Sequence, residues 1–410
     1  MSNPPFQVGG PLSPKLPVYV ERKADEQAYE YIRRMDYLKL IETRQQGKTS
    51  LIYRLIDRFK NDNYVFAYFS MEILPSKQID EITWYTYLID RILLQLKAIP
   101  DVEKLLTPKN GREWFNFLSD LAELAGQANR KVVIVLDEIG GASSDWATNF
   151  FSAMRSAHIH RPIQPAFEYL SFILAGAYND RALIGDENIS PFNVAQQVHL
   201  EDFNVEQTRL LTMYLTDSSE AQTLLAEHIH YWTDGQPYLT HWLCRELVGQ
   251  ELTTVTVDLL IDKFCREDSN HLPHVFAFSR NKVLKEYIKR IADGNIVSFA
   301  PGYLRSQMKL ALMGIIKGIE GQCKIRNRLY QRALTDILAD TSEEIEPLLN
   351  PSPLDNIRKL IMEHHARLHE LRMQKAAGGI FTDPKITIEI TQIEQEVEEL
   401  ERQRRELEGD

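Results

Sequence analysis

Residues 41–55 read IETRQQGKTSLIYRL, and this stretch decides the fold class. Its GKT tripeptide, residues 47–49, matches the end of the phosphate-binding pattern G-x-x-x-x-G-K-S/T, whereas Glu42 replaces the first glycine of that pattern. A short apolar run precedes the tripeptide and an amphipathic stretch follows it, which predicts a loop between a strand and a helix. Backbone N–H groups converge in such a loop, and the helix N-terminus favours anions. The stretch therefore predicts a site for nucleotide phosphates.

A second sequence element supports this site. Residues 131–138 read KVVIVLDE, a continuous apolar run that ends in two carboxylates. In an open α/β sheet, ligands bind at the carboxyl ends of buried strands, which is where Asp137 and Glu138 are expected to lie. The alternative is an ordinary strand that ends in a solvated acidic turn, but the GKT loop upstream in the same pattern favours the nucleotide site.

The residue types predict a division of roles around ATP and Mg²⁺. Lys48 is expected to reach the terminal phosphates, and the Thr49 hydroxyl is expected to bind Mg²⁺. Asp137 would hold the metal through water, and Glu138 would be the base that polarises the attacking water. A carboxylate at position 42 would repel a triphosphate, so we expect the Glu42 side chain to point away from the phosphates.

The composition narrows the class of protein. The chain has 410 residues, 44% of them hydrophobic, which suffices for two or three domains. No run approaches the ~20 apolar residues that a membrane span needs, and the N-terminus lacks the features of a signal peptide, so we expect a cytoplasmic protein. Three widely spaced cysteines indicate neither a disulfide framework nor a zinc site and are expected to be buried. The net charge of −11 argues against a protein that coats nucleic acid along its whole length.

The order of apolar runs predicts the domain organisation. Continuous apolar runs separated by amphipathic stretches indicate a parallel sheet covered on both faces, so we expect a three-layer α/β domain at residues 20–203. An extended, proline-rich lead-in precedes it at residues 1–19, and a helical region follows at residues 204–269. Helices followed by a small hairpin then predict a winged-helix domain at residues 270–340.

Residues 341–410 predict a linker and an antiparallel helical hairpin. Apolar residues recur at spacings of three and four from Ile357 to Leu371 and again from Ile386 to Leu400, and the glycines and proline between them supply a turn. One interpretation is that this hairpin packs onto the neighbouring domain. The other is that it docks another chain, and the pattern favours neither.

Seven motifs occur in one order: GGPLSPKLPVYVERKADEQAYEYI, RQQGKTSL, TWYTYLI, VIVLDEI, SPFNVAQQVHLEDF, GQPYLT and IRNRLYQRAL. As an ordered set over roughly residues 9–340, they resemble the AAA-like ATPases of bacteria, close to the STAND signal-transduction NTPases. The resemblance implies a P-loop NTPase core, a helical lid at residues 204–269, a winged-helix domain and slow ATP hydrolysis. In that family the first loop position is often not glycine, which accommodates Glu42.

The resemblance also implies further nucleotide contacts. The segment YVER is similar to the one that packs on the adenine, which places Val20 and Arg22 near the base, and the proline of GQPYLT touches the nucleotide in the family's lid. Asn179 or Arg181 lies where a sensor residue reads the γ-phosphate, although this sequence departs from the usual pattern there. Arg44 either contacts phosphate or braces the loop. The candidate nucleotide ligands are Val20, Arg22, Arg44, Gln45, Gln46, Gly47, Lys48, Thr49, Ser50, Asn179, Arg181 and Pro237.

STAND proteins alternate compact and open arrangements of core, lid and winged helix, so the resemblance implies a nucleotide-driven switch. The C-terminal hairpin is similar to adaptor segments found beside effectors in bacterial conflict systems. We therefore expect a regulatory or scaffold subunit in bacterial defence or signalling. It would recruit a separately encoded effector or adaptor protein through this hairpin and form a nucleotide-dependent homo-oligomer.

Two alternatives stay open. Residues 281–332 hold eleven Lys and Arg against three Asp and Glu, a local balance of +8, so the runner-up is a DNA-binding ATPase of the initiator or transposition-regulator type. Its candidate phosphate contacts are Arg305, Lys309, Lys324, Arg326 and Arg328. The other alternative is a nucleotide-binding scaffold without turnover.

Overall fold

The computed structural model describes residues 5–73, 80–142, 146–177, 193–267, 281–300 and 305–339, together with Arg402. Residues 1–338 form one compact unit, and residues 339–410 form a second. The predicted C-terminal hairpin, apart from Arg402, lies outside the described residues, as do the candidate sensor residues Asn179 and Arg181. Within the described residues, no helix has both the length and the apolar character that a bilayer crossing demands.

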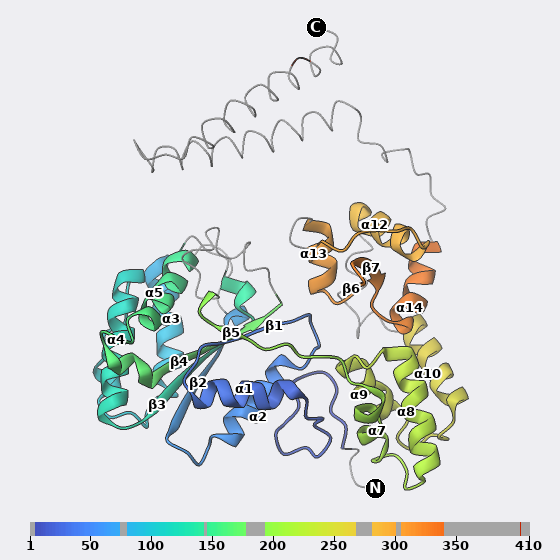
Figure 1. The fold of residues 1–410 in the computed structure, drawn as a ribbon, viewed down its shortest axis with the longest axis horizontal. Coiled ribbons are helices and arrows are strands. Elements are labelled where there is room, and N and C mark those ends of the chain that lie inside the picture. Colours follow the sequence, from blue (N-terminus) through green and yellow to red (C-terminus); the bar gives the residue numbers. More distant parts are fainter. Residues whose placement is uncertain are drawn as a thin grey trace. The chain divides into compact units, whose positions relative to one another are not determined.

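A five-stranded sheet forms the centre of the first part of the chain (Figure 1). Its order is β2-β3-β4-β1-β5, and each neighbouring pair is parallel. The prediction of an α/β fold with a parallel sheet is therefore confirmed. Because β4 pairs with both β1 and β3, it separates the strand before the GKT loop from the strand that ends at Asp137. The strands are β1 (Leu38–Ile41), β2 (Tyr64–Ser70), β3 (Lys131–Asp137), β4 (Leu170–Gly176) and β5 (Gln196–Gln197).

Helices connect most of these strands, and for two of the helices the residue just before the first turn shows why the helix begins there. The side chain of Asp80 accepts a hydrogen bond from the Thr83 N–H, and that of Asn110 accepts from the N–H groups of Arg112 and Glu113, so each satisfies N–H groups that a helix leaves unpaired. The helices are α1 (Lys23–Arg33), α2 (Lys48–Arg58), α3 (Glu81–Leu93), α4 (Gly111–Gln127) and α5 (Ala147–Ile159). Short 3₁₀ turns are η1 (Met71–Ile73), η2 (Val102–Lys104), η3 (Ile139–Ala142) and η4 (Pro165–Tyr169).

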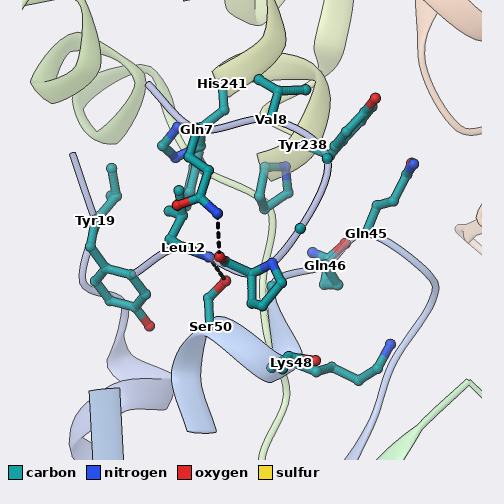
Figure 2. Close-up of a pocket in the computed structure, with 18 of the residues that line it drawn as sticks. Gln7, Val8, Leu12, Tyr19, Gln45, Gln46, Lys48, Ser50, Tyr238 and His241 are labelled. Carbon is teal, nitrogen blue, oxygen red and sulfur yellow. Dashed lines mark hydrogen bonds between the residues drawn. The ribbon is translucent and has the colours of Figure 1, made fainter. Parts of the chain in front are cut away.

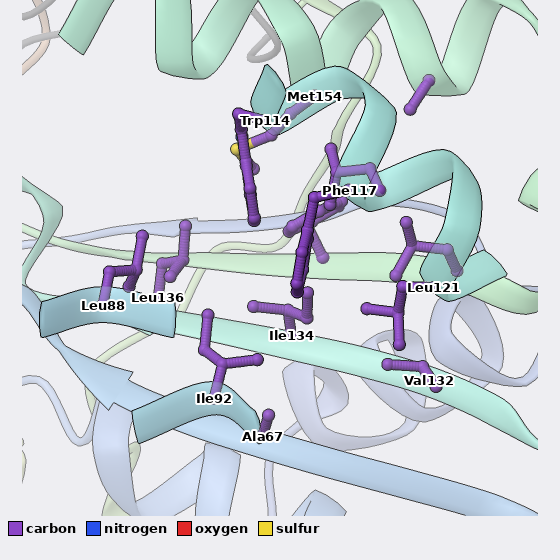
Figure 3. Close-up of a cluster of buried hydrophobic side chains, with 14 of the residues drawn as sticks. Ala67, Leu88, Ile92, Trp114, Phe117, Leu121, Val132, Ile134, Leu136 and Met154 are labelled. Carbon is purple, nitrogen blue, oxygen red and sulfur yellow. The ribbon is translucent and has the colours of Figure 1, made fainter. Parts of the chain in front are cut away.

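Strand β3 is buried on both sides, and the alternation of its residues divides the core between the two faces of the sheet. Val132, Ile134 and Leu136 pack with helices α3, α4 and α5 (Figure 3). Val133 and Val135 belong instead to the cluster that contains α1 and α2. Burial on two faces explains why this strand reads as a continuous apolar run rather than as an alternation. Helices therefore cover both faces of the sheet. Because β1 and β3 both run parallel to β4, the loops that follow β1 and β3 lie at the same edge of the sheet.

A helical region and a small hairpin follow the sheet. Strands β6 and β7 are antiparallel, with Ile316 opposite Ile325. We call α12, α13, β6, β7 and α14 the β-hairpin module; its assignment as a winged helix stays a prediction. The helices are α7 (Val205–Thr212), α8 (Ser219–Thr233), α9 (Pro237–Glu246) and α10 (Thr254–Glu267). The β-hairpin module consists of α12 (Lys282–Ala292), α13 (Arg305–Leu312), β6 (Ile316–Ile319), β7 (Gln322–Ile325) and α14 (Arg328–Ala339).

One hydrophobic cluster joins three parts that are far apart in the sequence. Phe6 and Val20 of the N-terminal segment, Leu243 of α9 and Ile316 of β6 belong to it. All three cysteines are buried in the same cluster, as predicted. Residues 5–22 contain no helix or strand, so this extended segment is held by its side chains rather than by regular backbone pairing. The predicted domain boundaries within residues 1–338 stay predictions.

Candidate functional site

The loop between β1 and α2 occupies residues 42–47, and its backbone is strongly curved. Gln45 has φ 62° and Gly47 has φ 89°, both in the left-handed region. Glycine adopts this region without steric cost, whereas a residue with a Cβ pays about 1 kcal/mol or more, so strain is concentrated at Gln45. Gly47 directly precedes Lys48, the first residue of α2. The loop thus delivers backbone N–H groups and a helix N-terminus to one place, as anion binding requires.

Glu42 is compatible with this loop because its carboxylate is bonded elsewhere. Its Oε1 accepts hydrogen bonds from the backbone N–H of Leu200, at 3.1 Å, and from Nδ1 of His199, at 3.2 Å. Burial raises the pKa of the Glu42 carboxyl, and these two contacts oppose that rise. The side chain therefore points toward residues 199–200, as expected, and does not face the space where phosphates would lie.

Lys48 lies inside the loop rather than on its surface. Its Nζ donates to the backbone carbonyl oxygens of Glu42, at 3.0 Å, and Thr43, at 2.8 Å, and the residue is 5% exposed. Burial lowers the pKa of Lys48, while the carboxylates of Glu138, Asp137 and Glu42 act in the opposite direction. The ammonium group is thus held against the backbone of the loop by two uncharged carbonyl partners, which an entering anion can replace.

Behind the loop, three groups meet at the Asp137 carboxylate. Its Oδ2 accepts hydrogen bonds from the hydroxyls of Thr49, at 2.7 Å, and Tyr68, at 2.9 Å, and its Oδ1 accepts from the Glu138 N–H, at 2.9 Å. Asp137 is 1% exposed. The predicted metal ligands Thr49 and Asp137, which are 88 positions apart in the chain, are therefore adjacent in space. Tyr68, at the end of β2, was not predicted.

Glu138 follows Asp137 in a strained backbone conformation. Its φ is 50°, which is unusual for a residue other than glycine, and such outliers cluster at functional sites. Burial raises the pKa of the Glu138 carboxyl, the charges of Asp137 and Glu72 add to the rise, and Lys48 opposes it. A carboxylate with a raised pKa is a better general base near neutral pH than an ordinary one.

Of these residues, Lys48, Thr49 and Glu138 line a pocket of about 590 Å³ (Figure 2). One wall is the loop, a second is the N-terminal segment, and a third is the start of α9. The backbone N–H of Leu12 donates to Ser50 Oγ at 2.9 Å, which fixes the N-terminal segment against α2. The lining residues are Gln7, Val8, Gly9, Gly10, Pro11, Leu12, Tyr19, Val20, Arg22, Gln45, Gln46, Gly47, Lys48, Thr49, Ser50, Glu138, Phe203, Pro237, Tyr238 and His241.

The wall formed by α9 depends on one glycine. Gly235 has φ 73°, and a Cβ built on it would lie 1.8 Å from the carbonyl oxygen of Phe203. The Phe203 N–H also donates to the Gly235 carbonyl at 2.8 Å. No side chain fits into so close an approach. Glycine at this position therefore allows the backbone of Phe203 to lie directly against the segment that leads into α9.

Known proteins are similar to this chain over most of its length. The family model described as "AAA-like domain" matches residues 7–336, which is most of the chain. The protein belongs to the AAA-like domain family. An uncharacterized WD repeat-containing protein of Synechocystis sp. is 28% identical over an alignment of 364 residues that covers 81% of this chain. The chain spans only 30% of the length of that relative.

Two solved structures are similar to this chain. The Walker-type ATPase PABY2304 of Pyrococcus abyssi matches with a TM-score of 0.56 at 15% sequence identity, over 81% of this chain and 99% of that one. The ORC2 protein of Aeropyrum pernix, in ADPNP and ADP complexes, gives a TM-score of 0.45 at 14% identity, over 81% and 96%. The first likeness supports the P-loop ATPase fold of the AAA-like chain, and at this identity it supports the fold alone.

The AAA-like pocket brings together most of the candidate ligands. Ten of the twelve are described, and nine of these line the pocket: Val20, Arg22, Gln45, Gln46, Gly47, Lys48, Thr49, Ser50 and Pro237. Arg44 is exposed and outside the lining, and its backbone N–H donates to the Leu312 carbonyl at 3.2 Å. Arg22 Nη1 donates to the carbonyl oxygens of Gln46, at 3.1 Å, and Glu201, at 3.2 Å, so it links the backbone of the loop to the segment after β5. The nucleotide contacts themselves stay predictions.

Arg326 requires a correction. The sequence suggested it as a DNA-phosphate contact on an exposed wing, but the residue is 6% exposed. Its Nη1 donates to Thr43 Oγ1 at 2.7 Å, and its Nη2 donates to Gln46 Oε1 at 2.6 Å and to Asp202 Oδ1 at 2.7 Å. The guanidinium is therefore committed to the phosphate-binding loop. Lys309 and Lys324 are exposed, so the DNA-binding alternative stays a prediction with fewer cations to support it.

Three contributors to the AAA-like site were missed because they depend on distant contacts. Tyr68 holds Asp137, Arg326 holds the loop, and His241 lines the pocket. Only His241 left a signal in the sequence. It follows the predicted ligand Pro237 by four positions, and residues i and i+4 lie on the same face of a helix.

Proposed function

We propose that this AAA-like protein binds ATP, hydrolyses it slowly and acts in the cytoplasm as a STAND-type switch that recruits a separate effector. The observation that carries the proposal is that Lys48, Thr49 and Glu138 line one pocket next to the N-terminus of α2, with Asp137 hydrogen-bonded to Thr49 and Glu138. An ammonium group, a helix N-terminus and two carboxylates are the groups that nucleoside triphosphate chemistry needs.

The donor set fits a magnesium ion. Thr49 Oγ1 and Asp137 Oδ2 are 2.7 Å apart, and both are the hard oxygen ligands that Mg²⁺ prefers. The hydroxyl of Tyr68 on the same carboxylate oxygen orients Asp137. When bound, Mg²⁺ would neutralise negative charge on the β- and γ-phosphates. Thr49 would be its direct ligand, and Asp137 would hold it through water.

The remaining chemistry belongs to the protein. Lys48 exchanges its two carbonyl partners for phosphate oxygens, because a charged acceptor makes a stronger hydrogen bond than a carbonyl does. Glu138 accepts a proton from the water that attacks the γ-phosphate. The raised pKa of its carboxyl assists that transfer. The low dielectric of the site strengthens both the bond of Lys48 to phosphate and the bond of Glu138 to the attacking water.

The direct test is ATP binding to a Lys48→Met variant. Met keeps the length of the side chain and removes the charge, so we expect ATP affinity to fall on the order of 10- to 100-fold, as for the loss of a charged hydrogen bond. Isothermal titration calorimetry measures this. The control is Lys60→Met, whose ammonium pairs with Asp57 at 2.7 Å and which does not line the pocket. Equal ATP affinity in parent and Lys48→Met would contradict the proposal.

A switch needs a part that responds to the occupant of the phosphate-binding loop. The β-hairpin module is a candidate because it contacts the loop at three points. Arg326 bonds to Thr43 and Gln46, and the Leu312 carbonyl accepts from the Arg44 N–H. A rearrangement of the loop on phosphate binding would change all three contacts. We propose that nucleotide state reaches the rest of the protein by this route.

We propose that residues 351–410 recruit an effector or adaptor. The same residues would drive nucleotide-dependent self-assembly. Two apolar stripes of the predicted hairpin require a partner surface. Deletion of these residues is expected to abolish co-purification of a partner and to reduce ATP-dependent assembly in mass photometry. ATP affinity should stay within about threefold of the parent, because the residues that line the pocket all lie between positions 7 and 241. Unchanged partner binding and assembly would rule out the adaptor role.

A further inference from the structure

His241 combines burial with a lack of hydrogen-bond partners at the edge of the pocket. It lies on α9, one turn after Pro237, so both side chains face the pocket. In Figure 2, His241 lies beside Gln7 and Val8, whereas Lys48 lies at the opposite end of the view. In this view the histidine therefore lies apart from Lys48, the side chain that would meet the terminal phosphates.

Both ring nitrogens of His241 lack a hydrogen-bond partner within the described part of the chain, although the residue is only 5% exposed. The ring makes edge contacts with Phe6 and Phe203, with centroids 6.3 Å and 6.2 Å away. Each buried unpaired polar group costs about 1–3 kcal/mol, so native proteins rarely keep one without a purpose. An apolar residue of similar size would suit these aromatic neighbours better.

The charge state of His241 limits what it can bind. Burial, together with the positive charge of Arg22, lowers the pKa of His241 to about 4. At neutral pH the ring is uncharged, and it offers one N–H donor and one nitrogen acceptor. A neutral ring suits an uncharged polar group rather than a phosphate. Two other polar residues of the lining are already engaged: Gln7 Nε2 donates to the Pro11 carbonyl, and the Tyr19 hydroxyl donates to Asp25.

The walls around His241 are mainly apolar. Val8, Val20, Phe203 and Pro237 line the same pocket, and flat or aliphatic surfaces of this kind suit an aromatic base. A ligand that places phosphates against Lys48 and an aromatic ring against these walls is a nucleotide. Its ribose hydroxyls and the edge of its base are the uncharged polar groups that would meet His241.

We propose that His241 binds the nucleoside half of the nucleotide directly, through a hydrogen bond from a ring nitrogen to the base edge or to a ribose hydroxyl. It is then a specificity-determining residue of the pocket. This inference rests on the proposed function and assigns part of its ligand recognition to a named side chain.

The test compares the full-length parent with His241→Leu by calorimetry. ATP affinity is expected to fall about 5- to 10-fold, as for the loss of one neutral hydrogen bond, whereas the affinity for inorganic tripolyphosphate stays unchanged. The melting temperature of ligand-free His241→Leu should equal or exceed that of the parent, because leucine removes two unpaired polar atoms from an apolar site. A histidine with a purely structural role would give a lower melting temperature and an unchanged ATP affinity.

The matched control is His158→Leu. His158 Nδ1 is also buried without a hydrogen-bond partner among the described residues, but His158 does not line the pocket. Its substitution should leave ATP affinity unchanged. An equal loss of affinity in both variants would mean that the effect is general and would overturn the role of His241.

Analogues distinguish the two sources of the hydrogen bond. Parent and His241→Leu are titrated with 2′-deoxy-ATP, 3′-deoxy-ATP and purine riboside triphosphate, which lacks the 6-amino group. The analogue that lacks the bonded group should bind the parent more weakly than ATP does, and that difference should disappear in His241→Leu. Persistence of every difference in the variant would overturn a direct contact. If the parent binds ATP and His241→Leu binds it equally well, only this inference fails; if the parent binds no ATP, the proposed function fails as well.

Discussion

Substitution of Glu138 by Gln is expected to lower the rate of ATP turnover on the order of 10²- to 10⁴-fold, the usual contribution of a general base. Gln keeps the shape of the side chain but cannot accept the proton of the attacking water. ATP affinity should stay within about threefold of the parent or increase slightly, because a negative charge near the phosphates is removed. The expected pattern is therefore a loss of turnover with binding retained.

Phosphate release measures this rate in the parent, in Glu138→Gln and in a control. The control is Glu72→Gln, because the Glu72 charge contributes to the raised pKa of Glu138 but the residue does not line the pocket. Its effect on turnover should not exceed about threefold. Equal background rates in the parent and in Glu138→Gln would remove the enzymatic role and support a nucleotide-binding scaffold.

The pH dependence of turnover provides a second check on Glu138. A general base must be deprotonated, so turnover should rise with pH through the pKa of this carboxyl. Burial raises that pKa, and the rise should therefore occur at a higher pH than for an ordinary exposed glutamate. A turnover rate that is flat across the acidic range would argue that another group takes the proton.

The sequence was informative about the fold wherever the signal was local. Five successive residues of β3, 132–136, form one apolar run because the strand is buried on two faces, and the predicted acid Asp137 follows that run. Strand β5, by contrast, is only Gln196–Gln197, and two polar residues carry no strand signal. Its pairing with Leu38 and Lys39 depends on the neighbouring strand rather than on its own composition.

The candidate site divides in the same way. The GKT tripeptide and the Asp137–Glu138 pair could be predicted because the chemistry requires those residue types at the ends of two strands. The support for Asp137 from the Tyr68 hydroxyl spans 69 positions, and the contact of Arg326 with Gln46 spans 280. No local pattern encodes contacts of that separation. The basic count in residues 281–332 included Arg326, whose side chain is buried, so it overstated the number of surface cations in that segment.

Arg326→Leu is expected to lower the free energy of unfolding by about 2–4 kcal/mol, because it removes a buried guanidinium from an ion pair whose Asp202 partner is 26% exposed. The guanidinium is nearly inaccessible, and its loss leaves Asp202 Oδ1, Gln46 Oε1 and Thr43 Oγ1 without their shared donor. Urea unfolding of the ligand-free protein measures the effect. The control is Arg328→Leu, an exposed cation 4.1 Å from the centroid of the Tyr231 ring, for which a loss of about 1 kcal/mol is expected.

A double-mutant cycle separates the ion pair from general damage to the β-hairpin module. Asp202→Asn removes the charge that Arg326 neutralises, so the double variant should be more stable than the sum of the single losses predicts, by about 1 kcal/mol or more. Strictly additive losses would show that Arg326 acts through packing alone.

Arg326→Leu also tests whether the β-hairpin module responds to the phosphate-binding loop. Arg326 directly follows β7 and bonds to Thr43 and Gln46, so ATP binding should change hydrogen exchange in β6 and β7 of the parent. In Arg326→Leu that response should be lost even under conditions where the variant is folded and saturated with ATP. If exchange in β6 and β7 changes equally in both proteins, nucleotide state reaches the module by another route, because the bonds that Arg326 makes would then be unnecessary for the transfer.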